Sequence, residues 1–399
     1  MAFNFIEYQE NEFLRPIPIP NKERYFSDIK EIVGSLAFFL GRKYGIAYEL
    51  VREIERMLIN AIALFEKGYF DAAFYMLRQT LEICMLMSYF LELPDDEREK
   101  EFSDWKGSAA RFPGVKDMRK KLETSNYSID FKDFKAKLPG FFTEFQDTYA
   151  KLNKFTHKQG FRYFYSIRWR KGYDKEIDIK LREDFIKYLD RCIGCAFMFR
   201  LMIDPLPILR MDEEIEYRIA DPMMFPLSAH VIKRYIGEKR LEEYKTTNLY
   251  VRFRDDILKN REKMTDATYA YVVEEYLPRV NIPGVMKQAH LLTLRQRIQL
   301  MLIASFPQIA VIHTYDGMWS CFTDVKSNCN SLSSSSEEFR ALQNSAKWEN
   351  QPYKGVYATV VKVHGEFYTL EHNEPLGPLT VMELGKYAAE IDKTIAPIT

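Results

Sequence analysis

Apolar residues recur every three or four positions through most of the first half of the chain, and this spacing restricts that half to a bundle of helices. The clearest stretch lies between Tyr44 and Lys67, and its apolar positions are Ala47, Leu50, Val51, Ile54, Met57, Leu58, Ala61, Ile62 and Phe65. Such a stripe is typical of an amphipathic helix that buries one face. The sequence therefore predicts a mainly α fold that begins with a helical bundle.

The same period continues in further segments until prolines interrupt the chain. Helices are expected from Asp71 to Leu91, from residue 95 onward, within 114–137, after Pro139, and over about 180–203. Pro205 and Pro207 then break the pattern, because proline cannot continue an α-helix. We therefore expect the first domain, the helical bundle, to cover residues 1–206.

Beyond this break the expected structure changes from helices to hairpins. Helices are predicted at 228–236, 238–260, 265–277 and 284–304, which gives a helical region over residues 207–306. The apolar period then shortens to that of strands, and two β-hairpins are predicted, one over residues 309–323 and one over residues 356–370. Each hairpin is followed by a helix with a capping signal. Residues 307–399 are therefore predicted to form a small α+β unit.

The composition argues against several classes of function. The 57 basic and 57 acidic side chains cancel, so the net charge gives no reason to expect a nucleic acid or an anionic membrane as partner. The sequence shows no signal peptide and no apolar run long enough to cross a bilayer. Five cysteines are an odd number, which argues against a disulfide framework and for a reducing compartment. We expect a cytoplasmic protein without a membrane partner.

The sequence gives no sign of a metal or a cofactor. Cys192 and Cys195 form a Cys-x-x-Cys pattern, but their apolar neighbours indicate a helix interior, so core cysteines are favoured over a redox or metal site. The histidines with no metal-ligand spacing are those at positions 230, 290, 313, 364 and 372. Glycine-rich phosphate-binding loops and the nucleophile-elbow motif are also absent from the sequence.

One segment concentrates positive charge and aromatic rings. Between Lys151 and Tyr173 the chain has seven Lys or Arg residues, seven aromatic residues and no acid. Because cations neutralise phosphates and rings stack on bases, this mixture is typical of surfaces that bind RNA or DNA. The expected nucleic-acid-binding residues are Lys151, Lys154, Lys158, Arg162, Arg168, Trp169, Arg170 and Lys171. The alternatives are a solvated helix end with an exposed hairpin, or a site for another anion.

Three polar residues of the bundle are candidates for catalysis. Asn153 and His157 lie four residues apart and would share one face of a helix. Arg78 and Glu82 have the same spacing on an otherwise apolar helix, where an intrahelical ion pair is the structural alternative. In a catalytic arrangement His157 would act as general acid or base, Asn153 would orient it, and Arg78 would stabilise a phosphate.

These residues carry a resemblance to a known family. A Leu-Arg-x-x-Leu-Glu pattern at 77–82, followed by Tyr-x-x-Leu-Asn-x-x-x-His at 149–157, is similar to the HEPN superfamily of helical bundles over about residues 44–204. The closest branches are uncharacterised and abortive-infection-type bacterial proteins. The resemblance implies a bundle that often dimerises through the histidine helix and, in active members, a metal-independent ribonuclease. Active members have an arginine where this chain has Leu152, which cannot donate to a phosphate.

Two functions follow as hypotheses. The favoured one is a HEPN-like module of a bacterial defence system that binds RNA or a protein partner, including a second copy, with catalysis disfavoured because Leu152 replaces the motif arginine. The alternative is a metal-independent endoribonuclease of the toxin or abortive-infection type that uses His157. A small-molecule sensor in residues 307–399 is a third idea supported only by the hairpins. A His157 buried against aliphatic side chains would reject both phosphate-based hypotheses.

Overall fold

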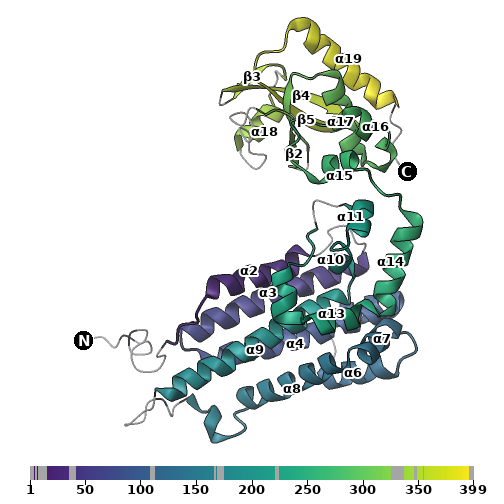
Figure 1. Ribbon diagram of the computed structural model, residues 1–399. Coiled ribbons are helices and arrows are strands. Elements are labelled where there is room, and N and C mark those ends of the chain that lie inside the picture. The colour runs from purple at the N-terminus through teal and green to yellow at the C-terminus, as the bar shows by residue number, and fades with distance from the viewer. Residues whose placement is uncertain are drawn as a thin grey trace. The chain divides into compact units, whose positions relative to one another are not determined.

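The computed structural model of the chain describes residues 4, 7, 16–35, 42–107, 113–165, 168, 175–220, 224–315, 317–324, 337–345, 348–353 and 355–394. The chain divides into two units, the first formed by residues 1–215 and 223–259 and the second by residues 216–222 and 260–399. Helices make up the described part of the first unit, and the second combines helices with a sheet (Figure 1). The expected fold class, mainly α with a small α+β part at the C-terminal end, is confirmed.

The first unit is a bundle organised around helix α4. Its helices and turns are α2 (Lys22–Gly34), α3 (Arg42–Glu66), α4 (Phe70–Glu92), α5 (Asp95–Lys106), α6 (Val115–Thr124), α7 (Ile129–Lys137), α8 (Pro139–Thr156), the 3-10 turn η2 (Phe161–Tyr163), α9 (Glu176–Leu201), α10 (Leu206–Leu209), α12 (Ala229–Val231), the π-helical turn η4 (Ile232–Ile236), α13 (Glu238–Lys245) and α14 (Asn248–Asn260). Helix α11 (Glu213–Ile219) begins in the first unit and continues into the second from Glu216, and the last residue of α14 is also assigned to the second unit. Helix α4 packs against α3, α8 and α9 (Figure 1).

Helix α4 is central because its sequence is apolar on nearly every side. All residues from Cys84 to Leu91 are buried. Nearer its start, the ring of Phe74 stacks on Phe155 of α8, with centroids 4.0 Å apart. Burying one large apolar side chain contributes roughly 1.5–3 kcal/mol, so a helix of this composition is stable only inside a bundle.

The first unit continues past the proline break. Tyr244 of α13 donates its hydroxyl to the carbonyl oxygen of Leu201 at 2.8 Å, and its ring lies 6.0 Å from that of Phe134. These contacts attach α13 to the end of α9 and to α7. The boundary expected at residue 206 therefore does not coincide with the end of this unit, which extends to residue 259.

The second unit contains a five-stranded antiparallel sheet. Its elements are α15 (Asp266–Val273), α16 (Ile282–Met286), the 3-10 turn η5 (Ala289–Leu291), α17 (Leu294–Ser305), β1 (Ile309–His313), β2 (Trp319–Cys321), α18 (Glu337–Gln343), β3 (Gln351–Tyr353), β4 (Val356–Val363), β5 (Glu366–His372) and α19 (Pro378–Thr394). The strand order is β2-β1-β5-β4-β3. Both predicted hairpins are confirmed, as β1–β2 and β4–β5. Strand β3 was not expected.

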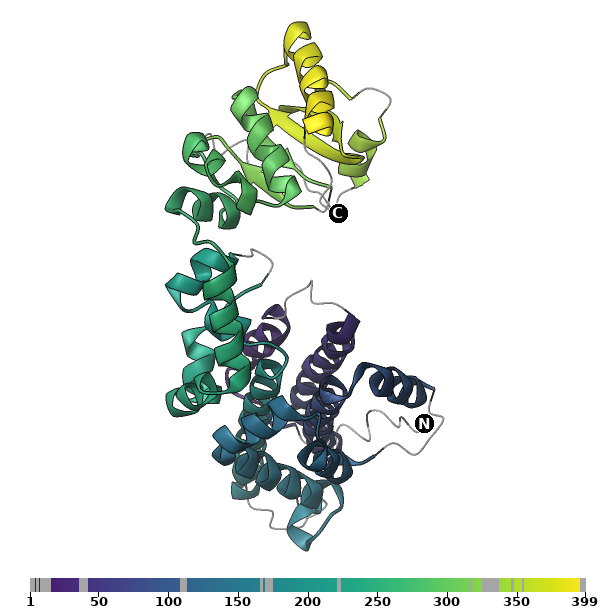
Figure 2. The same cartoon turned by 90° about the vertical axis from the view of Figure 1, so that its right-hand side faces the viewer.

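The two faces of this sheet differ in polarity. One face packs against α17 and α19 through an apolar cluster that includes Ile312, Leu370 and Ile391, and Figure 2 shows α19 lying across the strands. The other face carries a fully buried pair, in which His313 Nε2 lies 2.5 Å from Glu371 Oε1. This pairing gives His313 a structural role in the sheet.

The cysteines divide into a free set and a bonded one. Cys84, Cys192 and Cys195 are free and buried, and burial raises the pKa of all three thiols. The prediction of core cysteines at positions 192 and 195 is thus confirmed. Cys321 is disulfide-bonded, which departs from the expectation of a chain without a disulfide framework. Cys329 lies outside the described residues.

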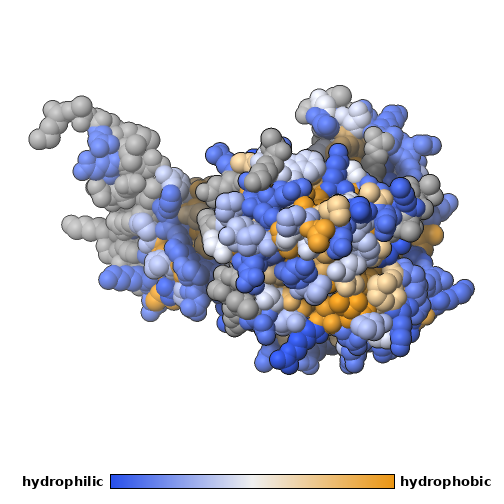
Figure 3. Space-filling model, turned by 90° about the horizontal axis from the view of Figure 1, so that it is seen from above, coloured by the Kyte–Doolittle hydropathy of each residue, from blue (hydrophilic) through white to orange (hydrophobic). Residues whose placement is uncertain are grey.

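Membrane and metal features were searched in the same described part of the chain. None of its helices combines the length and the apolar character that a bilayer crossing requires. Among the residues with described positions, no three His, Cys, Asp or Glu side chains gather as a metal site would need. Hydrophilic residues cover most of the face shown in Figure 3, with hydrophobic residues gathered in separate patches.

Helix α9 and the turn η4 approach each other closely at Gly194, and a substitution there tests this packing. A Cβ atom added at Gly194 would lie 2.7 Å from the backbone oxygen of Tyr235, whereas one added at Gly45 in α3 would meet nothing within 4 Å. We expect Gly194→Ala to lower the free energy of unfolding by about 1–3 kcal/mol, because the two backbones must separate. Gly45→Ala should be neutral or stabilising by up to about 1 kcal/mol. Thermal or urea unfolding measures both, and equal losses of stability would contradict this packing.

Candidate functional site

A polar network centred on Arg78 joins α4 to α8. Arg78 Nε donates to Asn153 Oδ1 at 2.7 Å, and Arg78 Nη2 donates to Glu82 Oε1 at 2.6 Å. Tyr149 donates its hydroxyl to the same Glu82 oxygen at 2.8 Å, and its ring centroid lies 5.8 Å from the guanidinium carbon. Burial, together with the hydrogen bond to Glu82, raises the pKa of Tyr149, so this hydroxyl stays a donor. The partly buried charges of Arg78 and Glu82 are thereby paired, as burial requires.

This network assigns Arg78 and Asn153 a structural role. The intrahelical ion pair between Arg78 and Glu82, one of the two expectations for these residues, is present. Asn153 accepts from Arg78, and within the described residues neither of these side chains hydrogen-bonds to His157. Leu152, at the position of the motif arginine, is fully buried in the core. The structure therefore does not bring Arg78, Asn153 and His157 together as a hydrogen-bonded catalytic set.

His157 lies at the end of α8, where its backbone N–H donates to the carbonyl oxygen of Asn153 at 2.9 Å. Its side chain is exposed, and no hydrogen bond or ion pair joins it to a residue whose position is described. The burial that would reject the phosphate-based hypotheses is thus not observed.

A cavity of about 330 Å³ lies beside the C-terminal end of α8, among η2 and the first half of α9. Its lining is a mixture of cations and aromatic rings; the residues that matter here are Lys151, Arg162, Tyr163, Tyr165, Lys180 and Tyr188. We call this cavity the basic–aromatic pocket. It brings together the start of the segment predicted to bind RNA and a part of α9 that the sequence interpretation did not include.

Three cations of the pocket are available to a ligand. Lys151, Arg162 and Lys180 are all exposed, and within the described part of the chain none of them forms an ion pair with an acid. Arg162 donates to the hydroxyl of Tyr163 at 2.6 Å, and its guanidinium carbon lies 4.7 Å from the centroid of that ring. This contact orients Arg162 without neutralising its charge.

Two other predicted cations are already paired with acids. Lys158 forms an ion pair with Asp71, donates to the carbonyl oxygen of Tyr163 at 2.9 Å, and lies over the ring of Tyr165. Arg168 is only 2% exposed, and its Nε lies 2.6 Å from Asp178 Oδ1. These pairs attach the chain after α8 to α4 and α9, which is a structural role.

Four further residues were predicted to bind nucleic acid, and the structure describes one of them. Lys154 is partly exposed and has no ion pair to a described acid, so it stays available beside Lys151. Trp169, Arg170 and Lys171 lie outside the described residues.

An exposed pair of rings adjoins the pocket. Phe161 and Phe164 are 60% and 43% exposed, and their rings stack with centroids 6.0 Å apart and an interplanar angle of 23°. Because the two rings lie side by side, they form an exposed apolar patch, which is more informative than a single exposed ring. Phe164 also lines the pocket, so the rings and the cations form one continuous surface.

The residues that α9 contributes to the pocket could have been found from their spacing in the sequence. Lys180, Asp184 and Tyr188 are spaced four residues apart, which places them on one face of a helix. Asp184 is the one acid that lines the pocket among the described residues. Burial raises its pKa, although Lys180, Lys187 and Arg162 act in the opposite direction.

Removing the acceptor of Arg78 tests the network. We expect Asn153→Ala to lower the free energy of unfolding by about 1–3 kcal/mol, because a partly buried guanidinium N–H loses its partner. Asn153→Asp keeps an acceptor and should retain most of the stability. Lys151→Ala on the same helix should change stability by less than about 0.5 kcal/mol, since that side chain is exposed. Denaturant unfolding compares the three, and an unchanged Asn153→Ala would show that Arg78 does not depend on this bond.

The raised pKa of Asp184 makes stability depend on pH in a defined direction. Because the folded-state pKa lies above the ordinary value of 3.8, ionising this carboxyl destabilises the fold as the pH rises through that window. Asp184→Asn should therefore raise the melting temperature at about pH 7 and leave it unchanged at about pH 3, where the carboxyl is protonated in both states. Asp147→Asn, on the exposed side of α8, is the control. A stabilisation of Asp184→Asn that persists at low pH would contradict this assignment.

Comparisons of this chain with protein-family models, with curated proteins and with solved structures found no significant match. The likeness to the HEPN superfamily therefore remains a prediction that rests on the patterns at residues 77–82 and 149–157.

Proposed function

We propose that the first unit binds single-stranded RNA at the basic–aromatic pocket, as a module without catalytic activity. The observation that supports this most directly is that three cations, which form no ion pair with any acid of described position, adjoin the exposed rings of Phe161 and Phe164. Cations attract the phosphates, and stacking of a base on an aromatic ring is worth about 1–3 kcal/mol without regard to sequence. As a HEPN-like module, the unit would serve RNA recognition within a bacterial defence system.

Single-stranded RNA suits this surface better than a duplex does. Stacking on Phe161 and Phe164 requires bases whose faces are free, which unpaired strands provide. Each phosphate contact with a single strand contributes roughly −0.7 to the slope of a plot of log association constant against log salt concentration. Three contacts therefore predict a slope of about −2. A phosphate site that held only one anion would show a shallower slope.

The proposal of a module without catalytic activity is supported by the contacts that Arg78 of α4 and Leu152 of α8 make. Arg78 donates to Glu82 and Asn153, and Leu152 faces the core. Arg78 is thus engaged within the protein and Leu152 carries no charge, so neither is placed to stabilise charge on a phosphate in the transition state. The exposed His157 therefore lacks the arginine partner that active members of the HEPN superfamily use.

Charge reversal in the pocket tests RNA binding. Lys151→Glu, Arg162→Glu and Lys180→Glu should each weaken binding of a fluorescent single-stranded RNA by about tenfold, since a phosphate contact is replaced by repulsion. Phe161→Ala should weaken it through lost stacking, with little change in the salt slope. Lys239→Glu, whose side chain is 92% exposed on α13, is the matched control and should bind as the unmodified protein does. Fluorescence anisotropy over a range of salt concentrations gives both affinity and slope. Equal effects at Lys239 and at the pocket would contradict the proposed site.

The same RNA tests the catalytic alternative. In EDTA we expect the RNA to remain intact with the unmodified protein and with His157→Ala, and gel electrophoresis of end-labelled RNA shows this directly. Cleavage by the unmodified protein that is lost in His157→Ala would contradict the non-catalytic proposal and support the ribonuclease.

A further inference from the structure

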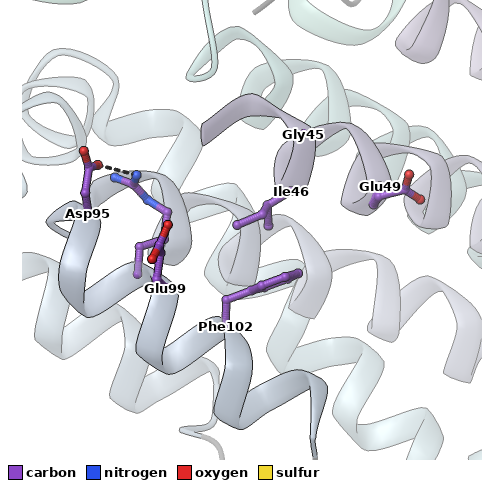
Figure 4. Close-up of a pocket in the computed structure, with 7 residues that line it drawn as sticks. Gly45, Ile46, Glu49, Asp95, Glu99 and Phe102 are labelled. Atoms are coloured by element: carbon purple, nitrogen blue, oxygen red, sulfur yellow. Dashed lines mark hydrogen bonds and ion pairs between the residues drawn. The ribbon is translucent and has the colours of Figure 1, made fainter. Parts of the chain in front are cut away.

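Two adjoining cavities form a second surface on the first unit, where α3 meets α5. Their volumes are about 630 and 620 Å³, and both are lined by Ile46, Glu49 and Phe102. Figure 4 shows Ile46 on α3 and Phe102 on α5 pointing toward each other across the first cavity. The second cavity continues between α3 and α4 as far as the start of α6. We call the two together the acidic groove.

The floor of the acidic groove is apolar. Its main side chains are Ile46, Leu50, Ile83, Phe102, Trp105 and Met118. Phe102 and Trp105 contact each other, with centroids 5.7 Å apart, and remain only partly buried. Partly exposed apolar surface in a concave site gains free energy when a partner excludes water from it.

The rim of the groove has more acids than cations, although Glu82, Asp95 and Glu53 form ion pairs with Arg78, Arg98 and Arg56. Glu49, Glu53, Glu82, Asp95 and Glu99 line the two cavities, and Arg98 is the one cation of their described lining. That arginine is buried, and it is held by Asp95 at 2.6 Å and by the carbonyl oxygen of Phe90 at 2.7 Å. Its charge is therefore not available to a ligand.

We propose that the acidic groove docks a basic amphipathic helix of a partner protein. Such a helix buries anchors spaced at i, i+3 or i+4, and i+7 in an apolar groove, and its flanking Lys and Arg residues meet the acidic rim. The apolar floor and the excess of acids over cations at the rim together match this occupant. A nucleic acid does not, because the rim repels phosphates. The inference stands independently of the RNA-binding proposal.

A synthetic helix is the probe. A fluorescent peptide of about 18 residues, roughly five helical turns, carries leucines at the helical spacing and lysines elsewhere. We expect it to bind the full-length protein, and to bind more weakly when its leucines are rearranged at constant composition. Replacing its lysines by glutamates should abolish binding. Equal binding of the rearranged peptide would overturn the proposal, because only charge would then be recognised.

Variants locate the binding site. Glu49→Lys and Glu53→Lys combined should weaken peptide binding by about tenfold, since two attractive contacts become repulsive. Ile46→Ser should weaken it by removing an anchor contact on a partly exposed position. Asp147→Lys, an exposed acid of α8 outside the groove, is the control, and circular dichroism verifies the fold of each variant. Unchanged affinity in the Glu49 and Glu53 variant would overturn the assignment.

Cross-linking identifies the occupant. A carbodiimide joins carboxylates to nearby amines, so Glu49 or Glu53 should form amide bonds to lysines of the peptide, which mass spectrometry detects. Cross-links from these acids to lysines of the chain itself, in the absence of peptide, would overturn the proposal in favour of an intramolecular occupant. A dimer in sedimentation that Glu49→Lys dissociates would overturn it in favour of a second copy.

Discussion

The partly buried charge of Arg78 is the constraint on which both candidate surfaces depend. A guanidinium that is partly removed from water is stable only when an acid and hydrogen-bond acceptors surround it. Asn153 accepts from Arg78 and Tyr149 donates to Glu82, so these bonds hold α8 in place on α4. Helix α8 carries the basic–aromatic pocket at its C-terminal end, and Glu82 lines the acidic groove. One network thus fixes the helices that present both surfaces.

The zero net charge of this chain conceals a separation of charge within the first unit. The pocket gathers Lys151, Arg162 and Lys180, whereas the groove gathers acids and has only a buried, paired Arg98 in its described lining. If both proposals hold, each set of charges would attract one class of partner and repel the other, and the local distribution of charge would decide which partner binds where. A module that binds RNA at one place and a basic helix at another can therefore use both without competition for the same groups.

Periodicity alone identified most helices and both hairpins, but it could not identify contacts between distant residues. Residues 238–260 show one helical pattern, yet the structure ends α13 at Lys245, where the hydroxyl of Thr247 donates to the carbonyl oxygen of Tyr244 at 2.7 Å and competes with the helix. The spacing of Arg78 and Glu82 predicted their pairing. That Arg78 would also meet Asn153, and that Lys158 and Arg168 would be neutralised by acids of α4 and α9, depends on tertiary packing.

The geometry of α8 disfavours an arginine at position 152, where the resemblance to the HEPN superfamily would place one in an active member. Leu152 faces the core, where an arginine would bury a charge at a cost of several kcal/mol unless an acid were buried with it. The other faces of this helix are already in use. Tyr149 and Asn153 hydrogen-bond within the Arg78 network, and Lys151 and Phe155 line the pocket. A catalytic arginine at this position would thus require a different packing of α4 against α8. The packing that positions the basic–aromatic pocket is thus the same packing that buries Leu152.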